Sequence, residues 1–299
     1  IGQIFQGPLS DRFGRRPVLL AGIAVYAVAA LGCLFAETFA ALLAARFVQG
    51  LANAAPRIIA IAVVRDIYEG RRMAEVMSFV MTVFIIVPVI APSIGGAFLL
   101  FGTWHLIFAF LSVCALGILT WVAIRLPETH PAAEREPMSA RWLVGAAAEI
   151  GGNRIAVGYT LAAGVLFGSL LAYVNSAQQI FVESFGVGDW FPVIFGSVAA
   201  ALAVAAFVNG RSVMRFGMRR ISHAAVLGFA AAGLAHLGYY LAFGTPPLWL
   251  FLGFLACCLF CFGLIAPNFT SLAMERLGRV AGTASSFIGA TTTLVGALL

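Results

Sequence analysis

The sequence predicts an all-α membrane protein, on three observations. Hydrophobic residues make up 62% of the chain and charged residues 10%, and the mean hydropathy is +1.01, far outside the range of a soluble domain. The apolar residues gather in long runs, most of them close to or above the roughly 20 residues that a membrane-spanning helix needs. These runs lack the alternation of apolar and polar residues that a membrane β-barrel requires.

The apolar runs follow one another along the chain with short polar breaks. The stub of a helix at 1–6 leads into an Arg- and Gly-rich loop at 7–20. The runs then cover residues 18–35, 39–64, 76–101, 104–126, 155–182, 190–208, 221–243, 248–272 and 280–299. Because the chain opens in the tail of one helix and stops within an apolar run, we expect an internal fragment of a longer protein.

A polar, proline-containing stretch predicts the division into domains. We expect a helical half at 1–126, a cytoplasmic linker at 127–153 and a second helical half at 154–299. A repeat supports two similar halves, because five residues of the first loop recur at a constant offset of 203. Gly7, Arg12, Phe13, Gly14 and Arg16 reappear as Gly210, Arg215, Phe216, Gly217 and Arg219, while Met214 replaces Asp11. Such a parallel pseudo-repeat predicts a cavity between the halves.

The distribution of arginine predicts the orientation in the membrane. All 18 positively charged side chains are arginine, and 16 of them fall in the breaks and run ends on one side of the predicted layout. The breaks on the other side carry only Glu37, Glu183 and Asp189. The excess of positive charge places the Arg-rich loops in the cytoplasm. The basic pI of about 9.4 therefore indicates membrane orientation and not nucleic-acid binding.

The two remaining arginines, Arg46 and Arg57, lie inside the stretch at 39–67, which consists of the apolar run at 39–64 and the three residues after it. Eleven residues of helix amount to about three turns, so the two arginines share one face roughly 16 Å apart, with Gln49 and Asn53 between them. An arginine near the bilayer centre costs about 2.5–3.5 kcal/mol on insertion scales and usually faces the protein interior or a wet cavity. We expect one helix that presents this polar face to a cavity. The alternative is a structural role, with the guanidinium bound to backbone carbonyls.

A second polar group lies in the outer half of the run at 155–182. It consists of Tyr173, Asn175, Gln178 and Gln179. Uncharged amides beside an aromatic ring suit a permissive substrate pocket. The alternative is hydrogen bonding between helices.

Three short motifs resemble those of the major facilitator superfamily. GPLSDRFGRRP (Gly7–Pro17) is similar to the loop signature between its helices 2 and 3, and RFVQG (Arg46–Gly50) to its helix 4 motif. PVIAPSIGG (Pro88–Gly96) is similar to the helix 5 motif of its antiporters. With Arg65-Asp66 and the Leu126-Pro-Glu-Thr start of the linker, the chain resembles the Bcr/CflA-type multidrug resistance transporters, which are drug:proton antiporters.

The resemblance implies the major facilitator fold, with two pseudo-repeated helical halves around a central cavity, here incomplete at both ends from the end of helix 2 to helix 11. It implies a transporter of the bacterial inner (cytoplasmic) membrane that exports small molecules by proton-coupled antiport with alternating access. The expected partners are a cationic or neutral amphiphilic drug, protons and membrane lipid, for a monomer without cofactor, metal or nucleic acid. The alternatives are a dedicated metabolite exporter, a symporter and an inactive truncated remnant.

The resemblance also implies roles for single residues. A cytoplasmic latch that holds the outward-open state would comprise Gly7, Asp11, Arg12, Gly14, Arg15 and Arg16, and the alternative is an orientation signal alone. On this basis Asp11→Asn should leave insertion intact and lower transport. Arg46 would take part in proton coupling or substrate binding. A seal against proton leak, in a helix that prolines kink and glycines thin, would comprise Pro88, Pro92, Gly95 and Gly96.

The acidic residues limit the predicted mechanism. No Asp or Glu lies in the middle of an apolar run, although a proton-coupled transporter needs a titratable group near the midplane. In the family, helix 1 is expected to hold that carboxylate. A membrane-embedded enzyme would need a nucleophile–base pair, an H-E-x-x-H motif or paired intramembrane carboxylates, and the sequence has none of these patterns. We therefore expect a transporter and not an enzyme.

Overall fold

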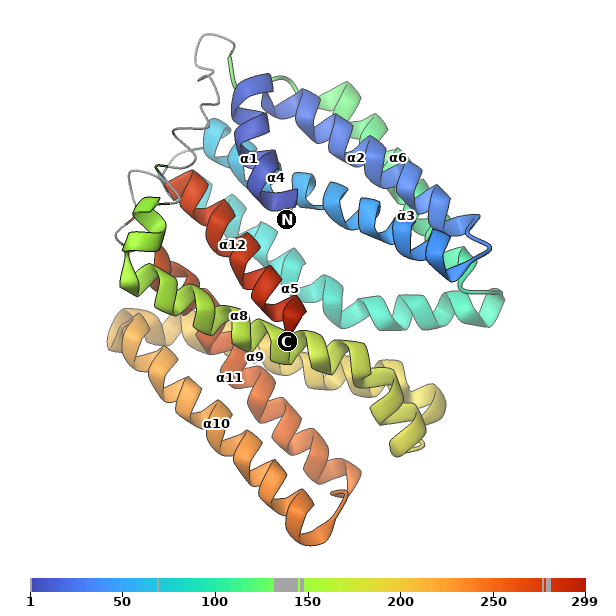
Figure 1. The fold of residues 1–299 in the computed structure, drawn as a ribbon, viewed down its shortest axis with the longest axis vertical. Coiled ribbons are helices and arrows are strands. Elements are labelled where there is room, and N and C mark those ends of the chain that lie inside the picture. Colours follow the sequence, from blue (N-terminus) through green and yellow to red (C-terminus); the bar gives the residue numbers. More distant parts are fainter. Residues whose placement is uncertain (1, 69, 132–144, 146–147, 276, 278–280) are drawn as a thin grey trace. The chain divides into compact units, whose positions relative to one another are not determined.

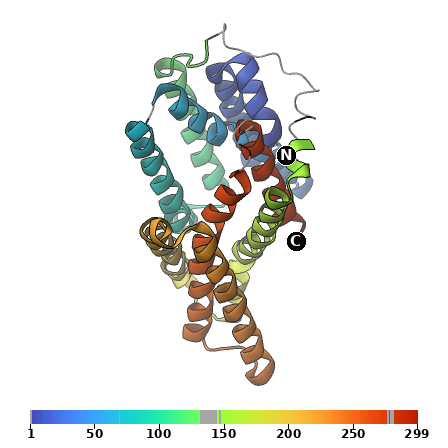
Figure 2. The same ribbon diagram turned by 90° about the vertical axis from the view of Figure 1, so that its left-hand side faces the viewer.

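A computed structural model describes the chain except for residues 1, 69, 132–144, 146–147, 276 and 278–280. The described part is helical, without a strand, as expected for an all-α membrane protein (Figures 1 and 2). The first group of helices is α1 (Gly2–Phe13), α2 (Arg15–Leu34), α3 (Phe39–Ala52), α4 (Ala54–Ile67), α5 (Gly70–Phe101) and α6 (His105–Arg125). The second is α8 (Arg154–Gln178), α9 (Phe191–Phe216), α10 (Met218–Phe243), α11 (Leu248–Met274) and α12 (Ala281–Leu298).

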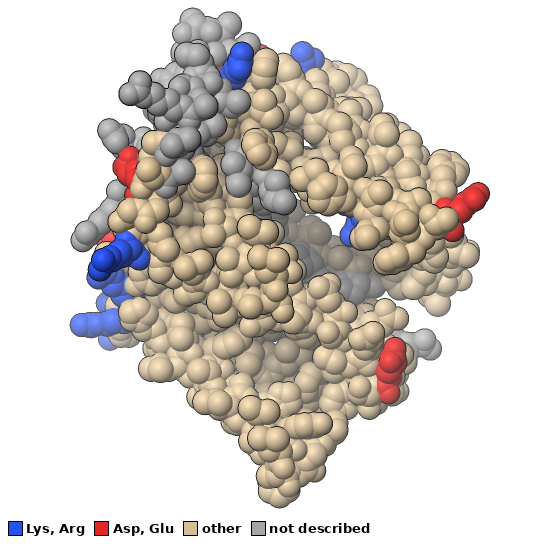
Figure 3. All heavy atoms as spheres, viewed as in Figure 1, with Lys and Arg blue, Asp and Glu red and all other residues tan. Residues whose placement is uncertain are grey.

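Seven stretches of the described chain are long and apolar enough to cross a membrane. They are Arg15–Leu34, Phe39–Val64, His105–Arg125, Arg154–Ser184, Phe191–Phe216, Met218–Phe243 and Leu248–Met274. Each corresponds to one of the apolar runs in the sequence. On the face shown in Figure 3, charged atoms are few and are separated by broad areas of uncharged surface, as expected for helices that lie in lipid.

The stretch at 39–67 forms two consecutive helices, α3 and α4, where the sequence predicted one. The physical reason is Pro56, which has no N–H to donate to the carbonyl of Ala52 and whose ring crowds that carbonyl. Asn53 stands between the helices with φ −64° and ψ −14°, and its N–H still bonds to the Gln49 carbonyl at 2.9 Å. The break is therefore local, and one candidate span runs through it.

The first Arg-rich loop is also shorter than predicted. α1 continues through Gly7 to Phe13, and the single residue Gly14 separates it from α2 with φ 100° and ψ 155°. At the offset of 203, Gly217 separates α9 from α10 with φ 79° and ψ 153°. Only glycine adopts these angles readily. The repeat in the sequence thus builds the same sharp corner twice.

The chain packs into two compact units. Unit 1 comprises Ile1–Thr82, Gly95–Glu149 and Val280–Ala290, and unit 2 comprises Val83–Ile94, Ile150–Arg279 and Thr291–Leu299. α5 and α12 each supply residues to both units. The division into two halves joined by a linker stays a prediction, and much of the linker lies outside the described residues.

In unit 1, α2 packs against α4 and α6. Its core holds Leu19 and Ile23 of α2 with Ala55 and Ile59 of α4, all at most 7% exposed. A Cβ added to Gly22 would lie 2.5 Å from the Ala55 Cβ. The close approach of α2 and α4 therefore depends on the absence of a side chain at Gly22.

In unit 2, α11 lies against α8, α9 and α10 (Figures 1 and 2). Its Ile265 is fully buried with Ala205 of α9. Small residues set the spacing: a Cβ on Gly263 would lie 2.6 Å from the Ala205 Cβ, and one on Gly164 of α8 would lie 2.7 Å from the Val295 Cβ of α12. Close helix packing in lipid relies on such residues.

Candidate functional site

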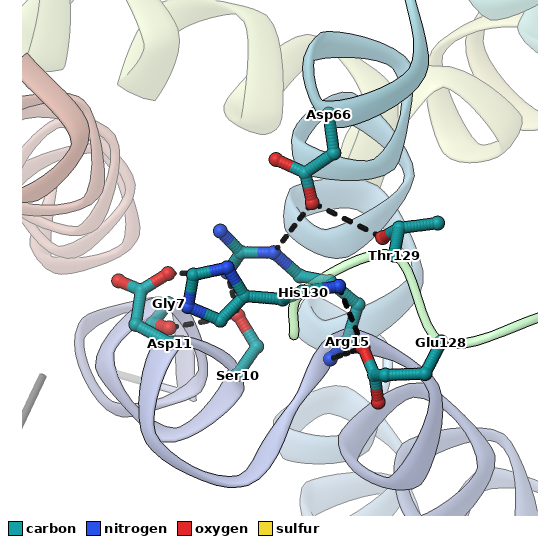
Figure 4. A network of polar contacts seen from close by, with 8 residues as sticks. All are labelled: Gly7, Ser10, Asp11, Arg15, Asp66, Glu128, Thr129 and His130. Atoms are coloured by element: carbon teal, nitrogen blue, oxygen red, sulfur yellow. Dashed lines mark hydrogen bonds and ion pairs between the residues drawn. The ribbon is translucent and has the colours of Figure 1, made fainter. Parts of the chain in front are cut away.

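The corner between α1 and α2 places a buried arginine among acceptors. Arg15 opens α2 directly after Gly14 and is only 9% exposed. Its Nε donates to Oδ2 of Asp66, at the end of α4, over 3.1 Å. Its Nη1 donates to the Ser10 hydroxyl over 2.7 Å and pairs with Asp11, both on α1 (Figure 4).

The segment that follows α6 completes this network. The backbone N–H of Arg15 donates to Oε1 of Glu128 over 2.8 Å, and the same oxygen accepts the N–H of His130. The Thr129 hydroxyl donates to Asp66 over 3.1 Å. The network therefore ties α1, α2, α4 and the start of the linker together within unit 1 (Figure 4).

Asp66 and Glu128 also belong to this site, although the sequence did not predict them as site residues. A signal was present, because each follows an apolar run on the Arg-rich side of the predicted layout. Acidic and basic residues that emerge at one membrane surface are candidates to pair. A buried guanidinium in turn needs charged partners to offset its lost hydration.

The other predicted latch residues also contact unit 1. Arg12 is exposed, with its Cζ 5.2 Å from the centre of the Phe13 ring, and Arg16 donates to the Ala123 carbonyl over 2.7 Å. A Cβ on Gly7 would lie 3.1 Å from Oγ of Ser286 in α12. The motif thus braces unit 1, and its role as a latch stays a prediction.

Arg46 is a cation within the candidate span Phe39–Val64. Its Nη1 donates to Oε1 of Gln49 over 2.7 Å, and its Cζ lies 5.8 Å from the centre of the Phe108 ring of α6. Tyr26 of α2 lies close to both Arg46 and Gln49. Within the described part of the chain, no carboxylate pairs with Arg46.

Gln49 is buried at 2% exposure, and its Nε2 has no hydrogen-bond partner among the described residues. Asn53 is exposed at the joint between α3 and α4. Arg57 belongs to α4, but its side chain lies outside what the structure describes. The structure therefore brings Arg46 and Gln49 together, and the longer polar face stays a prediction.

One residue of the predicted second polar group, Tyr173, belongs to an aromatic pair in unit 2. The ring of Tyr173 on α8 stacks on that of Phe195 on α9, with centres 5.6 Å apart and planes 7° from parallel. The Tyr173 hydroxyl is buried and has no partner among the described residues. Asn175, Gln178 and Gln179 are exposed.

The sequence did not predict that Gln179 begins a π-helical turn, Gln179–Ser184, at the end of α8. Such turns are rare and often mark functional sites.

The sequence also did not predict a polar contact between two spans, α9 and α11. Asn268 of α11 is 3% exposed and donates through Nδ2 to Oδ1 of Asn209 on α9 and to the Leu264 carbonyl, each over 2.7 Å. The signal was an asparagine within an otherwise apolar run, since hydrogen bonds between membrane helices use such side chains.

The predicted antiporter motif lies on α5, which is helical from Gly70 to Phe101. The side chains of Pro88 and Pro92 lie outside the described residues. A Cβ on Gly95 would meet no described atom within 4 Å, and Gly96 is half-buried. A role of this motif in a seal stays a prediction.

Comparison with known proteins covers the whole chain. The model of the Major Facilitator Superfamily matches residues 1–299. The MFS-type transporter YdgK of Bacillus subtilis, described as uncharacterized, is 32% identical over 302 residues, which are 100% of this chain and 75% of that protein. The bicyclomycin resistance protein homolog of Haemophilus influenzae is 32% identical over 303 residues, with the same coverage. Multidrug resistance protein D of Escherichia coli K12 is 29% identical over 299 residues, 97% of this chain and 72% of that protein.

Solved structures show the same fold. A D-xylose-proton symporter matches with a TM-score of 0.74 and 16% identity, over 99% of this chain and 75% of that one. The xylose transporter XylE of E. coli, in a partially occluded inward-open conformation, matches with a TM-score of 0.71 and 14% identity, over 99% and 77%. Sequence and fold therefore agree from end to end, and the chain belongs to the Major Facilitator Superfamily of membrane transporters, beside relatives of the drug-resistance type that its three motifs predicted.

Proposed function

We propose that this protein exports structurally varied small molecules in exchange for protons, by alternating access. Two relatives are named for resistance, one to bicyclomycin and one to multiple drugs, and each aligns with nearly all of this chain. The resemblance of Pro88–Gly96 to the helix 5 motif of antiporters supports exchange over symport. The predicted cargo is a cationic or neutral amphiphilic drug.

Arg46 is the observation that carries the proposal. Its charge is permanent and lies within a candidate span, where an unpaired cation is costly. Its described partners, the Gln49 amide and the Phe108 ring, are neutral. A cation held in this way favours the deprotonated form of a nearby carboxylate. In the proposed mechanism, Arg46 therefore assists proton release from a carboxylate of the transporter when cargo binds.

Two buried donors support a role in substrate binding. Nε2 of Gln49 and the hydroxyl of Tyr173 are both buried without a described partner. An unsatisfied buried donor costs about 1–3 kcal/mol, which a hydrogen bond to a substrate would offset. We assign substrate binding to the eight residues predicted above, which are Arg46, Gln49, Asn53, Arg57, Tyr173, Asn175, Gln178 and Gln179.

The gate and the location complete the proposal. The Gly7–Arg16 corner controls opening on the cytoplasmic side, and the Arg15 network keeps that corner rigid while it does so. The protein works as a monomer in the bacterial inner membrane with its Arg-rich loops in the cytoplasm, where positive charge is retained during insertion.

The test is drug-dependent proton release from acid-loaded vesicles that contain the purified full-length protein. Several chemically different drugs should each release protons. Arg46→Gln should slow the release by about tenfold or more, because it removes an interaction that the coupled step needs. Arg125→Gln is the matched control, since Arg125 is an exposed arginine at the end of α6.

Each contrary result identifies an alternative. A response to one metabolite alone would indicate a dedicated exporter, and proton movement in the same direction as the solute would indicate a symporter. A folded protein that releases no protons with any solute would be an inactive remnant. Normal coupling in Arg46→Gln would refute the role given to Arg46.

A further inference from the structure

The corner between α9 and α10 carries an excess of positive charge that the matching corner between α1 and α2 does not. The segment 210–220, GRSVMRFGMRR, contains four arginines and no acidic residue. Of these, Arg219 pairs with Glu275 over 3.3 Å, with both side chains about half exposed. Arg211, Arg215 and Arg220 are exposed and form no ion pair with any residue that the structure describes.

The comparison of the two corners shows how this excess arises. At the offset of 203, Met214 and Met218 replace the ion-paired Asp11 and Arg15. Arg211 and Arg220 replace Pro8 and Pro17. The backbone corner is nevertheless kept, and so is the contact of an arginine with the following phenylalanine: Arg215 Cζ lies 5.2 Å from the Phe216 ring centre. The second copy has thus kept the shape of the corner, lost the internal neutralisation and gained two exposed cations.

The same corner exposes apolar side chains next to its cations. On α9, Phe207, Arg211 and Arg215 are spaced by four residues and share one face. Phe207 is 59% exposed and Met214 is 89% exposed. The Arg211 Cζ lies 3.9 Å from the centre of the Phe207 ring, which orients the guanidinium along the helix surface. Along this face, the apolar side chain of Phe207 is followed by the cations Arg211 and Arg215 toward the C-terminal end of α9.

The length of α9 places this face at the membrane surface. Its 26 residues span about 39 Å, which exceeds the roughly 30 Å of the hydrocarbon core. The last turns of α9 and the first turn of α10 therefore lie among the headgroups. A ligand at this level that offers a negative charge beside apolar chains is a phospholipid with an anionic headgroup.

We propose that Arg211, Arg215 and Arg220 form a binding site for the phosphate group of an anionic phospholipid, whose acyl chain lies on Phe207 and Met214. Binding there is independent of the proposed transport. It holds the α9–α10 corner at the headgroup level, much as carboxylates within unit 1 hold the α1–α2 corner.

The test is native mass spectrometry of the purified protein in detergent with added phosphatidylglycerol, cardiolipin or phosphatidylcholine. The protein should retain the two anionic lipids in preference to phosphatidylcholine. In the variant R211Q/R215Q/R220Q, retention of phosphatidylglycerol should fall by about tenfold or more, because each arginine contributes to attraction of an anionic lipid. The variant R211K/R215K/R220K should keep most of the binding, since it keeps the charge.

Two controls distinguish this site from nonspecific attraction of anionic lipids to a basic protein. R72Q/R125Q/R154Q removes three exposed arginines from other helix ends, and it should bind phosphatidylglycerol like the unchanged protein. Soluble glycerol 3-phosphate should not displace the lipid, because it lacks the acyl chains. An equal loss in both glutamine variants, displacement by glycerol 3-phosphate, or equal retention of phosphatidylcholine would overturn the proposal. Gel filtration and circular dichroism confirm that each variant is folded.

Discussion

Two arginines of unit 1 lie in opposite environments. A guanidinium cannot lose its proton at any accessible pH, so each must be stabilised as a cation. Arg15 is 9% exposed and meets two carboxylates, whereas Arg46 is exposed and meets an amide and an aromatic ring. The first arrangement neutralises the charge within unit 1, whereas the second leaves it without a carboxylate partner among the described residues. This contrast supports a bracing role for Arg15 and a transport role for Arg46.

The bracing role predicts which carboxylate matters to stability. Asp66 has a side chain 21% exposed and Asp11 one 55% exposed, while Arg15 has one 11% exposed. Asp66→Asn should destabilise the protein by about 2 kcal/mol or more, because it leaves a buried cation short of a counter-charge. Asp11→Asn should cost less than about 1 kcal/mol, since exposed pairs contribute little. Thermal unfolding of the two purified variants in detergent measures the difference.

Thr129→Val is the control for these variants. It removes the other hydrogen-bond donor to Asp66 without changing any charge. A larger loss in Asp11→Asn than in Asp66→Asn would show that the α1 carboxylate, and not the α4 one, neutralises Arg15.

At the scale of elements, missing side chains decide how closely helices approach. Gly22 and Gly32 both lie on α2. Only at Gly22 would an added Cβ lie closer to another helix than van der Waals contact allows. A proline breaks the ladder of hydrogen bonds between α3 and α4, and a glycine turns the chain sharply between α1 and α2. Local sequence chemistry therefore accounts for the breaks, and packing accounts for the spacing.

The two glycines of α2 give a matched test. Gly22→Ala places a Cβ 2.5 Å from the Ala55 Cβ, so the helices must separate at a cost of about 1–3 kcal/mol. Gly32→Ala places a Cβ 3.5 Å from the Ala45 Cβ, an ordinary contact, and alanine favours the helix by up to about 1 kcal/mol. Thermal unfolding should show a lower midpoint for Gly22→Ala and an unchanged or higher one for Gly32→Ala. Equal midpoints would show that α2 and α4 can separate freely.

At the scale of the whole molecule, the arginine count predicts which helix ends face the cytoplasm. α10 connects the Arg-rich corner at Gly217 with the uncharged turn at Gly244–Pro247, and it is a candidate span. Its two ends should therefore lie on opposite sides of the membrane.

Cysteine labelling in intact cells tests this orientation. With an impermeant maleimide added outside, Thr245→Cys should react at once, and Arg219→Cys only after the cells are opened. Both positions are exposed in the structure, so burial does not limit the reaction. The unchanged protein is the background control, because its own cysteines lie in helices. Labelling of Arg219→Cys from outside would reverse the proposed topology.

The sequence by itself determined the class of protein, the apolar spans and the family. Composition and run length decide whether a segment is stable in lipid, and both can be read directly along the chain. The repeat at an offset of 203 can likewise be read from the sequence, although the sharp corner that Gly14 and Gly217 each form is a finding of the structure. Arg46 and Gln49 could be placed together because three residues of helix separate them.

Only the tertiary structure decided which residues distant in the sequence meet. The contact of Arg15 with Asp66 joins residues 51 apart, that of Arg15 with Glu128 residues 113 apart, and that of Asn268 with Asn209 residues 59 apart. The periodicity of a helix determines which of its own residues share a face, but it carries no information about which face of another helix lies opposite. That choice depends on close approaches such as Gly22 with Ala55, where the fit of two surfaces and not their polarity selects the partner.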